Sequence, residues 1–570
     1  MGDGELPPTA PRAAGPSAPQ AAEPTAPRAA DLPEPSTLPR PWVDTYPPGV
    51  PTDFRLPAVP VPRLLDDAVR DFPDRPAVTV DRVRLDHATL ADRVGDAAAV
   101  LHERGIGHGD RVAVSLANLA SLPVVLLAVW RLGACAVPVA PDASERHLAA
   151  VLADATPTAL IASRQLVRAL GDAAPELTLQ VDDDRWLSTS RWPWRQPPRR
   201  GDRSANRLES VVAAGVRSPP VRRVDPDTPA LIDYRPDLPH RGLVYTHAAL
   251  VAGAFQARLW IPDVQAGREH TLVSERLTAV EPLVLGWLAG LLAGGCVELA
   301  DEPSGDALAR TIARSAPTLL VSTPRRLHRL LSDVDAERRN LSSLRVVLSC
   351  RGRFGPTLRG ELARRTDGAR IRATFTVPGA GALTHAQPVY GRAGPYTVGL
   401  PVTATTATLV DLDDPAQPVP DGVPGRLVVH GPQAAVGTHG RLADPWLHDG
   451  WVVSDQLGVV DAAGELTTLG PVAEVVRCGA TVIAPARAEA VLEDHPAVRR
   501  AAVVVDDGRV LAAVVCRRRP RPEPAELTAH CAEQLDAADV PEHIHLVDEL
   551  PETEAGTPAR DQLRATITGR

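Results

Sequence analysis

The strongest constraint on the fold is a regular alternation of helical and strand patterns between residues 88 and 163. In the segment 88–104, apolar residues recur at the spacing of one helix face. A glycine-rich stretch ends this helix, and RVAVSLAN at 111–118 follows as a buried strand. The pattern continues with a predicted helix at 121–133, a strand at 135–140, a helix at 144–154 and a strand at 158–163. Such alternation predicts an α/β fold in which helices cover both faces of a parallel sheet.

Further along the chain the pattern changes twice. After residue 226 the α/β alternation resumes, and over 395–470 it gives way to short strands separated by glycine turns. The last hundred residues predict a separate α+β unit, with a helix at 486–495, a hairpin of strands 498–505 and 510–517, a helix at 523–536 and a strand at 543–550. We therefore expect a large N-terminal domain over 41–470, with parallel sheets and a β-rich subdomain, and a small C-terminal domain over 471–570.

Composition and charge bound the setting of these domains. Residues 1–40 contain ten prolines and few bulky apolar side chains, so we expect a disordered tail there. The net charge of the 570-residue chain is −9, which argues against a dedicated nucleic-acid-binding protein. The longest uncharged apolar run, 283–297, is shorter than the roughly 20 residues of a membrane span. With no secretory pattern at the N-terminus, the sequence predicts a cytoplasmic protein.

The chain contains no lysine, because all 61 basic residues are arginine. This excludes every mechanism that depends on a lysine amine, including a phosphate-loop lysine and a Schiff base. The six cysteines lie far apart without any C-x-x-C pair, so neither a zinc site nor a disulfide framework is expected.

The segment 185–223 is strongly basic, with ten arginines against two acidic residues and three tryptophans among prolines. A surface insertion is the simplest interpretation. The alternative is a basic and aromatic patch that contacts an anionic membrane surface, giving peripheral membrane association, or an acidic partner.

Several blocks resemble the class I adenylate-forming (AMP-binding) superfamily, and within it the long-chain fatty-acyl-CoA ligases. The likeness runs from about residue 41 to 567, and the blocks keep the family order and spacing. They are PWVDTYPPGVP at 41–51, RLGACAVPVAP at 131–141, VGLPVTATTATLVD at 398–411, PGRLVVHGPQ at 424–433, DGWVVSDQLG at 449–458 and VPEHIHLVDELPETEAGTPARDQLR at 540–564.

The resemblance implies a fold and a chemistry. Family members make an acyl-adenylate from a carboxylic acid and Mg-ATP, then transfer the acyl group to a thiol, usually that of coenzyme A. This chemistry needs a loop of donors for the triphosphate, a carboxylate for Mg²⁺, an acceptor for the ribose and a positive charge at the reacting phosphate. ATP or AMP, magnesium and coenzyme A are therefore expected as cofactors only if the activity is retained.

The phosphate loop departs from the family pattern, roughly Y-T-S-G-S-T-G-x-P-K-G before a T-H pair. Here it reads IDYRPDLPHRG at 232–242, before Thr246 and His247. The internal glycines and the hydroxyl cluster are gone, and prolines stiffen a loop that should wrap phosphate. Arg241 occupies the position of the family lysine, and Arg235 offers a second fork of donors.

The adenine and magnesium block, G-Y-G-x-T-E in the family, reads TFTVPG at 374–379. Phe375 keeps an aromatic ring on which a purine can stack. Gly379 stands at the position of the magnesium-binding glutamate, so that carboxylate is lost.

The ribose block and the hinge are also altered. Gln456 stands where the resemblance places the ribose-binding aspartate, and its amide can accept one ribose hydroxyl more weakly than a carboxylate. Asp455 lies one residue early, so it either reaches the ribose through a shift of the backbone or is a turn residue. Downstream, the hinge residue corresponds to Gly470 and the neighbouring family arginine to Pro471, which should restrict rotation of the small domain.

The C-terminal block of the family carries a lysine directly after a glycine. Here Gly556 is followed by Thr557, and Arg560 lies three residues later, where we expect it to face elsewhere on a loop. The catalytic lysine is therefore absent.

An apolar segment, LVLGWLAGLLAGGC at 283–296, matches the family helix near the acyl site, although the usual histidine there corresponds to Ala279. The glycines in this segment also fit a helix that is simply buried in the core.

Three functions remain open from the sequence. The leading one is a degenerate ligase-like pseudoenzyme that binds an acyl chain, an acyl thioester, or a partner such as a carrier protein, without efficient adenylation. The second is an active ATP-dependent carboxylic acid–CoA ligase with unusual motifs. The third is acyl transfer that uses the acyl and thiol channels without ATP.

Overall fold

The computed structural model describes residues 32–568, except for short gaps at 53, 183, 185–186, 188–222, 236–240, 302–303, 352–353, 441–445, 449, 479–480, 507, 518–520 and 554–557. Residues 1–31 of the predicted tail lie outside this part of the chain. The stretch 32–40 contains a 3-10 helix, Pro35–Thr37, and the disordered tail stays a prediction. Leu32 and Leu38 pack against an apolar cluster that includes Trp451, and this contact gives the proline-rich stretch a fixed place.

A seven-stranded sheet forms the first layer of the large domain, with the order β18-β8-β7-β4-β3-β5-β6. The three strands predicted near 111, 135 and 158 are confirmed as β3, β4 and β5, and they pair in parallel. The strands are β3 (Arg111–Ser115), β4 (Cys135–Pro138), β5 (Ala159–Ala162), β6 (Leu177–Gln180), β7 (Pro229–Asp233), β8 (Leu243–Thr246) and β18 (Gly437–Thr438).

A nine-stranded sheet forms the second layer, with the order β15-β14-β13-β12-β11-β9-β10-β1-β2. Its central strands are parallel, so their carboxyl ends lie on one edge. The strands are β1 (Pro76–Val80), β2 (Val83–Asp86), β9 (His270–Val273), β10 (Cys296–Leu299), β11 (Leu319–Ser322), β12 (Val346–Ser349), β13 (Arg370–Phe375), β14 (His385–Ala386) and β15 (Leu400–Pro401).

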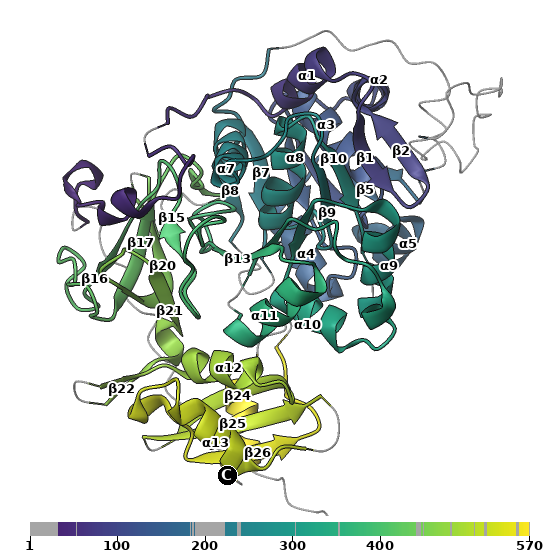
Figure 1. Ribbon diagram of the computed structural model, residues 1–570. Coiled ribbons are helices and arrows are strands. Elements are labelled where there is room, and N and C mark those ends of the chain that lie inside the picture. Colours follow the sequence, from purple (N-terminus) through teal and green to yellow (C-terminus); the bar gives the residue numbers. More distant parts are fainter. Residues whose placement is uncertain are drawn as a thin grey trace, which may run out of the picture.

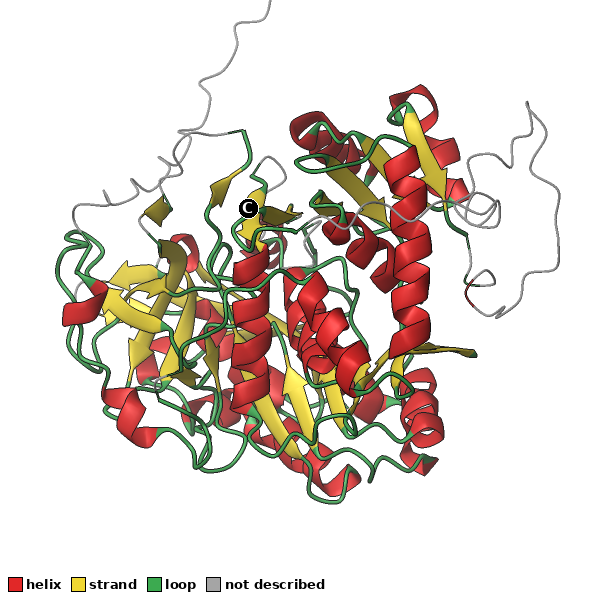
Figure 2. Ribbon diagram, turned by 90° about the horizontal axis from the view of Figure 1, so that it is seen from above, coloured by secondary structure: helices red, strands yellow, loops and turns green. Residues whose placement is uncertain are grey.

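Helices fill the space between the two sheets and cover their outer faces (Figure 1, Figure 2). Helix α3 (Ser121–Arg131) is buried at every residue from Ser121 to Trp130, as a helix packed on all sides must be. It shares the largest core cluster with α1 (Pro62–Asp71), α2 (His87–Glu103), α7 (His247–Trp260) and α8 (Ala289–Leu292). The outer helices are α4 (Glu145–Ala155), α5 (Arg164–Leu170), α9 (Gly305–Ser315), α10 (Pro324–Ser332) and α11 (Pro356–Arg365).

The short strands predicted over 395–470 mostly form a third, antiparallel sheet. Its order is β16-β17-β20-β19, and β21 pairs with β20. The strands are β16 (Thr406–Val410), β17 (Gly425–His430), β19 (Leu447–His448), β20 (Trp451–Val460) and β21 (Leu466–Pro471).

The small domain follows β21 and has the predicted α+β pattern. Strands β24 (Val498–Asp506) and β25 (Arg509–Cys516) form the antiparallel hairpin, and β26 (His543–Val547) adds in parallel. Helices α12 (Pro485–Asp494) and α13 (Pro524–Ala532) pack on one face, and α14 (Arg560–Thr568) packs on the other. Strands β22 (Val476–Cys478) and β23 (Thr481–Ile483) form a separate pair at the domain junction.

The small domain docks on the large one through hydrogen bonds. The carboxylate of Asp494, at the end of α12, accepts the backbone N–H groups of Thr357 and Leu358 at the start of α11. Helices α11 and α12 lie next to each other at the boundary between the domains (Figure 1). Nearby, Arg517 donates to Nδ1 of His328 in α10 at 2.6 Å. Within the described part of the chain, no helix is long and apolar enough to cross a membrane.

Candidate functional site

The segment around residues 435–439 brings two of the predicted blocks together. The backbone N–H of Ala435 donates to the carbonyl of Gly379, in the magnesium block, at 2.7 Å. The backbone N–H of His439 donates to the carbonyl of Gly242, at the base of the phosphate loop, also at 2.7 Å. These two blocks therefore lie beside each other, where the third sheet meets the first.

The phosphate loop connects two antiparallel strands, since Asp233 of β7 pairs with Leu243 of β8. Its central residues, 236–240, lie outside the described part, while Arg235 and Arg241 stand at its two ends. Tyr234 turns away from the loop and donates its hydroxyl to Asp154 of α4. Arg235 forms an ion pair with the buried Glu281 at 3.8 Å, so one of the two predicted phosphate-binding cations already has a carboxylate partner.

The Thr246–His247 pair after the loop has a structural role. The Thr246 hydroxyl accepts the N–H of Ala249 and thereby caps α7. Burial lowers the pKa of His247 to about 4, so this ring is neutral at physiological pH.

The magnesium block turns sharply after β13. Phe375 is half-buried and lies edge-on to His385, with ring centroids 6.1 Å apart. Gly379 has φ +88°, a conformation that side chains other than glycine rarely adopt. A Cβ atom there would lie 3.2 Å from Cδ2 of Leu447, 3.5 Å from Cγ1 of Val452 and 3.7 Å from Cδ2 of Leu243. A side chain at position 379 would therefore point toward aliphatic groups, and these groups cannot coordinate a magnesium ion.

The ribose block lies in β20. Asp455 is exposed, and it accepts a hydrogen bond from the Gln456 side chain at 3.0 Å. Gln456 also pairs across the sheet with Pro471, the last residue of β21. Gly470 before it has φ +106°, so the glycine is required at the junction between the domains.

Thr557 lies outside the described residues, but Arg560 does not. The expectation that Arg560 stands on a loop is wrong, because it is the first residue of α14. It forms ion pairs with Glu489 of α12 and with Glu474, which follows the hinge, at 2.7 Å for the second pair. Burial would lower the pKa of Arg560, but these two carboxylates raise it. Arg560 is therefore engaged inside the small domain.

The apolar segment 283–296 is buried, as the core interpretation expects. It begins as a π-helix, Pro282–Leu288, and continues as α8. A Cβ atom at Gly286 would lie 2.4 Å from Val273, which explains why the helix can approach β9 only with a glycine there.

Two charged residues near this segment were not predicted. Glu281 precedes the π-helix and is 3% exposed, and its carboxylate pairs with Arg351 at 2.7 Å. The one signal in the sequence was an acidic residue directly before a long apolar run. Its partners could not be identified, because Arg351 lies 70 residues away along the chain.

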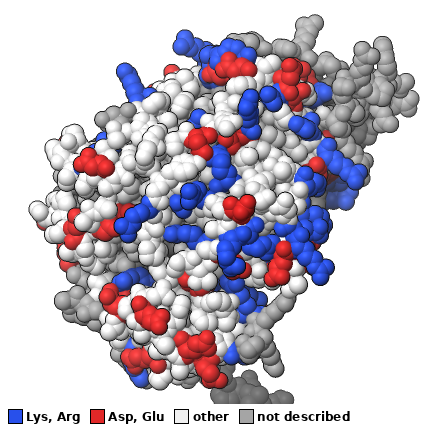
Figure 3. All heavy atoms as spheres, viewed as in Figure 1, with Lys and Arg blue, Asp and Glu red and all other residues white. Residues whose placement is uncertain are grey.

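The segment 185–223 lies outside the described residues except for Leu187 and Arg223, so the membrane or acidic-partner interpretation stays a prediction. On the face seen in Figure 3, arginine side chains nevertheless gather over part of the surface. Among the described residues, Arg325 and Arg329 of α10 are exposed, and Arg329 has Arg325, Arg326 and Arg499 as charged neighbours. Burial lowers the pKa of Arg329, and neighbouring arginines add to this effect.

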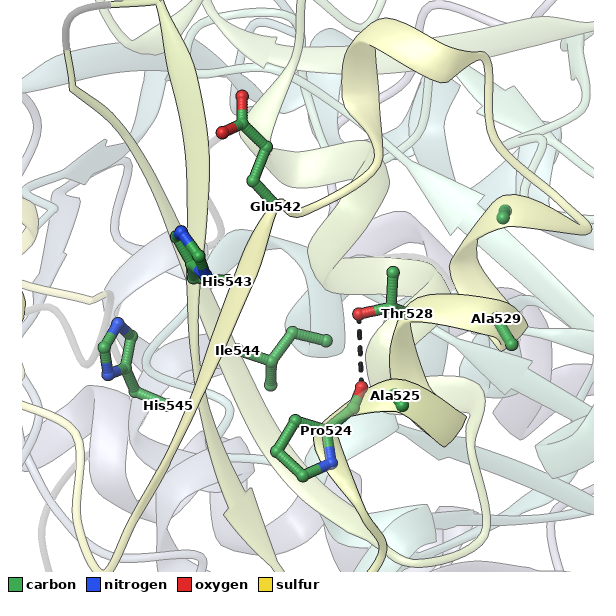
Figure 4. Close-up of a pocket in the computed structure, with 9 residues that line it drawn as sticks. Pro524, Ala525, Thr528, Ala529, Glu542, His543, Ile544 and His545 are labelled. Atoms are coloured by element: carbon green, nitrogen blue, oxygen red, sulfur yellow. Dashed lines mark hydrogen bonds between the residues drawn. The ribbon is translucent and has the colours of Figure 1, made fainter.

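A groove of about 620 Å³ lies in the small domain, between α13 and β26. Figure 4 shows Ile544 pointing toward α13, while His543 and His545 lie on the other side of the strand. The groove is lined mainly by small apolar groups, and its lining residues 542–545 belong to the family block at 540–564. Within the described ranges, no group of three or more His, Cys, Asp or Glu residues is placed to hold a metal ion.

Comparison with known proteins relates this geometry to a family. The model of the AMP-binding enzyme family matches residues 65–438, and that of the AMP-binding enzyme C-terminal domain matches residues 487–557. A long-chain-fatty-acid–CoA ligase of Escherichia coli O6:H1 is 26% identical over 93% of this chain and 98% of its own.

Two solved structures are similar over most of the chain. The anthranilate CoA ligase AuaEII in complex with anthranoyl-AMP has a TM-score of 0.77 and 19% identity, covering 91% of this chain and 98% of its own. The amide bond synthetase McbA from Marinactinospora thermotolerans has a TM-score of 0.74 and 25% identity, covering 90% of this chain and 100% of its own.

Proposed function

The chain belongs to the AMP-binding enzyme family, and from that premise we propose that it is a ligase-like pseudoenzyme. It keeps the two-domain scaffold of an acyl-CoA ligase and binds an acyl group, an acyl thioester or a protein partner without efficient adenylation. Its role is then one of binding rather than of ATP chemistry.

The observation that carries this proposal is the environment of Gly379. In the family this position supplies the magnesium carboxylate. Here the backbone is in the left-handed region, and the side chains of Leu447, Val452 and Leu243 line the direction in which a Cβ would point. A site that had lost only one carboxylate would leave polar space for water or another ligand group. An aliphatic lining instead supports a site that no longer holds a hydrated cation.

Three further features support the same conclusion. Arg235, at the phosphate loop, is paired with Glu281. Arg560 is paired with Glu489 and Glu474 and is not free to replace the missing lysine. No lysine exists elsewhere in the chain to supply that charge. Removing one transition-state contact typically costs about 10²–10³ in rate, and several are missing here together.

An active ligase with unusual motifs is the second candidate. Similarity to long-chain-fatty-acid–CoA ligases over 93% of the chain favours it, since this similarity spans both domains. In that case ATP, magnesium and coenzyme A are its cofactors, and a partner supplies the missing groups.

Acid-dependent ATP–pyrophosphate exchange distinguishes the two candidates. We expect no exchange above background with any acid of a panel of fatty and aromatic acids, in the presence of Mg-ATP. Binding of the same acids and of their CoA thioesters is measured in parallel by calorimetry. Robust exchange with any acid would refute the pseudoenzyme and establish the ligase.

A further inference from the structure

A buried carboxylate joins the two large sheets. Glu281 pairs with Arg351, which follows β12 of the nine-stranded sheet, at 2.7 Å. It also pairs with Arg235, which follows β7 of the seven-stranded sheet, at 3.8 Å. Both arginines stand just beyond the carboxyl ends of their strands. In open α/β sheets, ligands bind at this edge.

The electrostatics of this cluster are those of an occupied anion site. Burial alone would raise the pKa of Glu281, yet Arg351 and Arg235 hold it below its usual range, so the carboxylate is ionised. Guanidinium forks bind carboxylate and phosphate groups through the same planar pairs of hydrogen bonds. Glu281 therefore offers these arginines the same contacts that an anionic ligand group would offer.

The backbone of Arg351 indicates that this arrangement is held under strain. Arg351 has φ +58°, a left-handed conformation that is unfavourable for a residue other than glycine. Such outliers persist only where the surroundings fix them, and they are common at ligand sites. The half-exposed side chain of Arg351 pairs here with the buried carboxylate of Glu281.

We propose that Glu281 is an internal anion that occupies Arg235 and Arg351 in place of a phosphate or carboxylate group of a ligand. The inference rests on the proposed function and deepens it, because it gives a physical reason why the region beside the phosphate loop does not attract an anionic ligand. Removal of the Glu281 charge then exposes a binding site for a small anion, while the carboxylates of Asp233 and Glu275 stay near Arg351.

The test uses the full-length chain with Glu281→Gln, which keeps the size of the side chain and removes its charge. Glu298→Gln is the matched control, because Glu298 is also buried and paired, with His270 and Arg314, away from this edge. Melting temperature is followed against inorganic phosphate, pyrophosphate and hexanoate, with chloride at equal ionic strength as the reference.

We expect Glu281→Gln to melt below the wild type in chloride and to be stabilised by at least one of the three anions. Its half-maximal response should need an anion concentration about tenfold or more below that for the wild type, as one charge-assisted contact provides. A response to phosphate or pyrophosphate identifies a phosphate site, and a response to hexanoate alone identifies a carboxylate site. The double variant Glu281→Gln/Arg351→Gln should lose the response.

Several results would overturn the proposal. These are a response of Glu281→Gln no greater than that of Glu298→Gln, a wild type that responds equally, or a double variant that still responds. If Glu281→Gln does not fold in chloride, folding in one of the three anions supports the proposal, and failure in all of them refutes it. Pyrophosphate exchange by the wild type would refute the proposed function but not this inference, because the anion response of Glu281→Gln is measured independently of exchange.

Discussion

The contact between the two domains can be tested by a single substitution, Asp494→Ala. Asp494 is 4% exposed, and its carboxylate accepts the N–H of Thr357 at 3.0 Å and that of Leu358 at 3.3 Å. A residue of the small domain thus caps a helix of the large domain. Gly355 permits this approach, because a Cβ atom there would lie 2.1 Å from Cγ of Asp494.

The magnitude follows from these contacts. Loss of an N-cap carboxylate typically costs about 1 kcal/mol, within a range of about 0.5–2. The hydroxyl of Tyr396 also approaches Asp494, at 3.4 Å, but it keeps its hydrogen bond to Gln534 at 2.6 Å and so adds little to the loss. A loss of about 1.4 kcal/mol, in the upper half of that range, corresponds to a tenfold shift from the docked to the undocked small domain. The Arg517–His328 contact remains, so docking is weakened rather than abolished.

Trypsin offers a direct assay, since in this lysine-free chain it cleaves only after arginine. We expect Asp494→Ala to release the small domain about tenfold faster than the wild type, where cleavage follows undocking. Asp86→Ala is the control, because Asp86 caps α2 within the large domain, by accepting the N–H of Thr89 at 2.7 Å. An unchanged release rate for Asp494→Ala, or an equal acceleration by Asp86→Ala, would refute the idea that this cap holds the domains together.

Three further predictions concern the site and its stability. Gly379→Glu combined with Thr557→Lys should not restore pyrophosphate exchange, and exchange at a normal ligase rate would contradict this prediction. Gly379→Glu alone should lower the free energy of unfolding by about 1–2 kcal/mol, because position 379 has a positive φ. Arg560→Ala should cost roughly 2–3 kcal/mol in chemical denaturation, because two carboxylates lose their partner. Arg564→Ala should cost less than about 0.5 kcal/mol, because Arg564 is only partly buried and pairs with the exposed Asp561, and equal losses for the two variants would contradict this prediction. Burial and the charge of Arg517 lower the pKa of His328 to about 4, below its unfolded value of about 6.5, so its contribution is full above pH 6.5 and is lost as the pH falls toward 4. Thermal melting at pH 7 and pH 5 should therefore show a drop that is smaller in His328→Gln, and an equal drop in both proteins would argue against this role.

Much of the fold could be predicted because the local pattern of apolar residues indicates most of the helices and strands. The helix predicted at 88–104 is α2, and the hairpin of 498–505 and 510–517 is β24 and β25. Helix ends were less predictable, since the helix expected to reach 133 ends at Arg131 before Gly133, which has φ +73°. The π-helix Pro282–Leu288 could not be predicted, because a continuous apolar run has the same pattern in either kind of helix.

The sequence alone determined which chemical groups the protein possesses. A chain without lysine has no amine side chain for the adenylation step, and glycine at position 379 supplies no carboxylate, whatever the fold. These losses are properties of residue identity.

The tertiary structure determined which side chains surround the positions where the family residues are missing. Leu243, Leu447 and Val452 come from separate segments, and only folding directs them toward Gly379. Likewise, Glu281 meets Arg351 across 70 residues, and Asp494 reaches Thr357 across 137. Such contacts depend on how the sheets and domains pack, so they cannot be predicted from the spacing of residues along the chain.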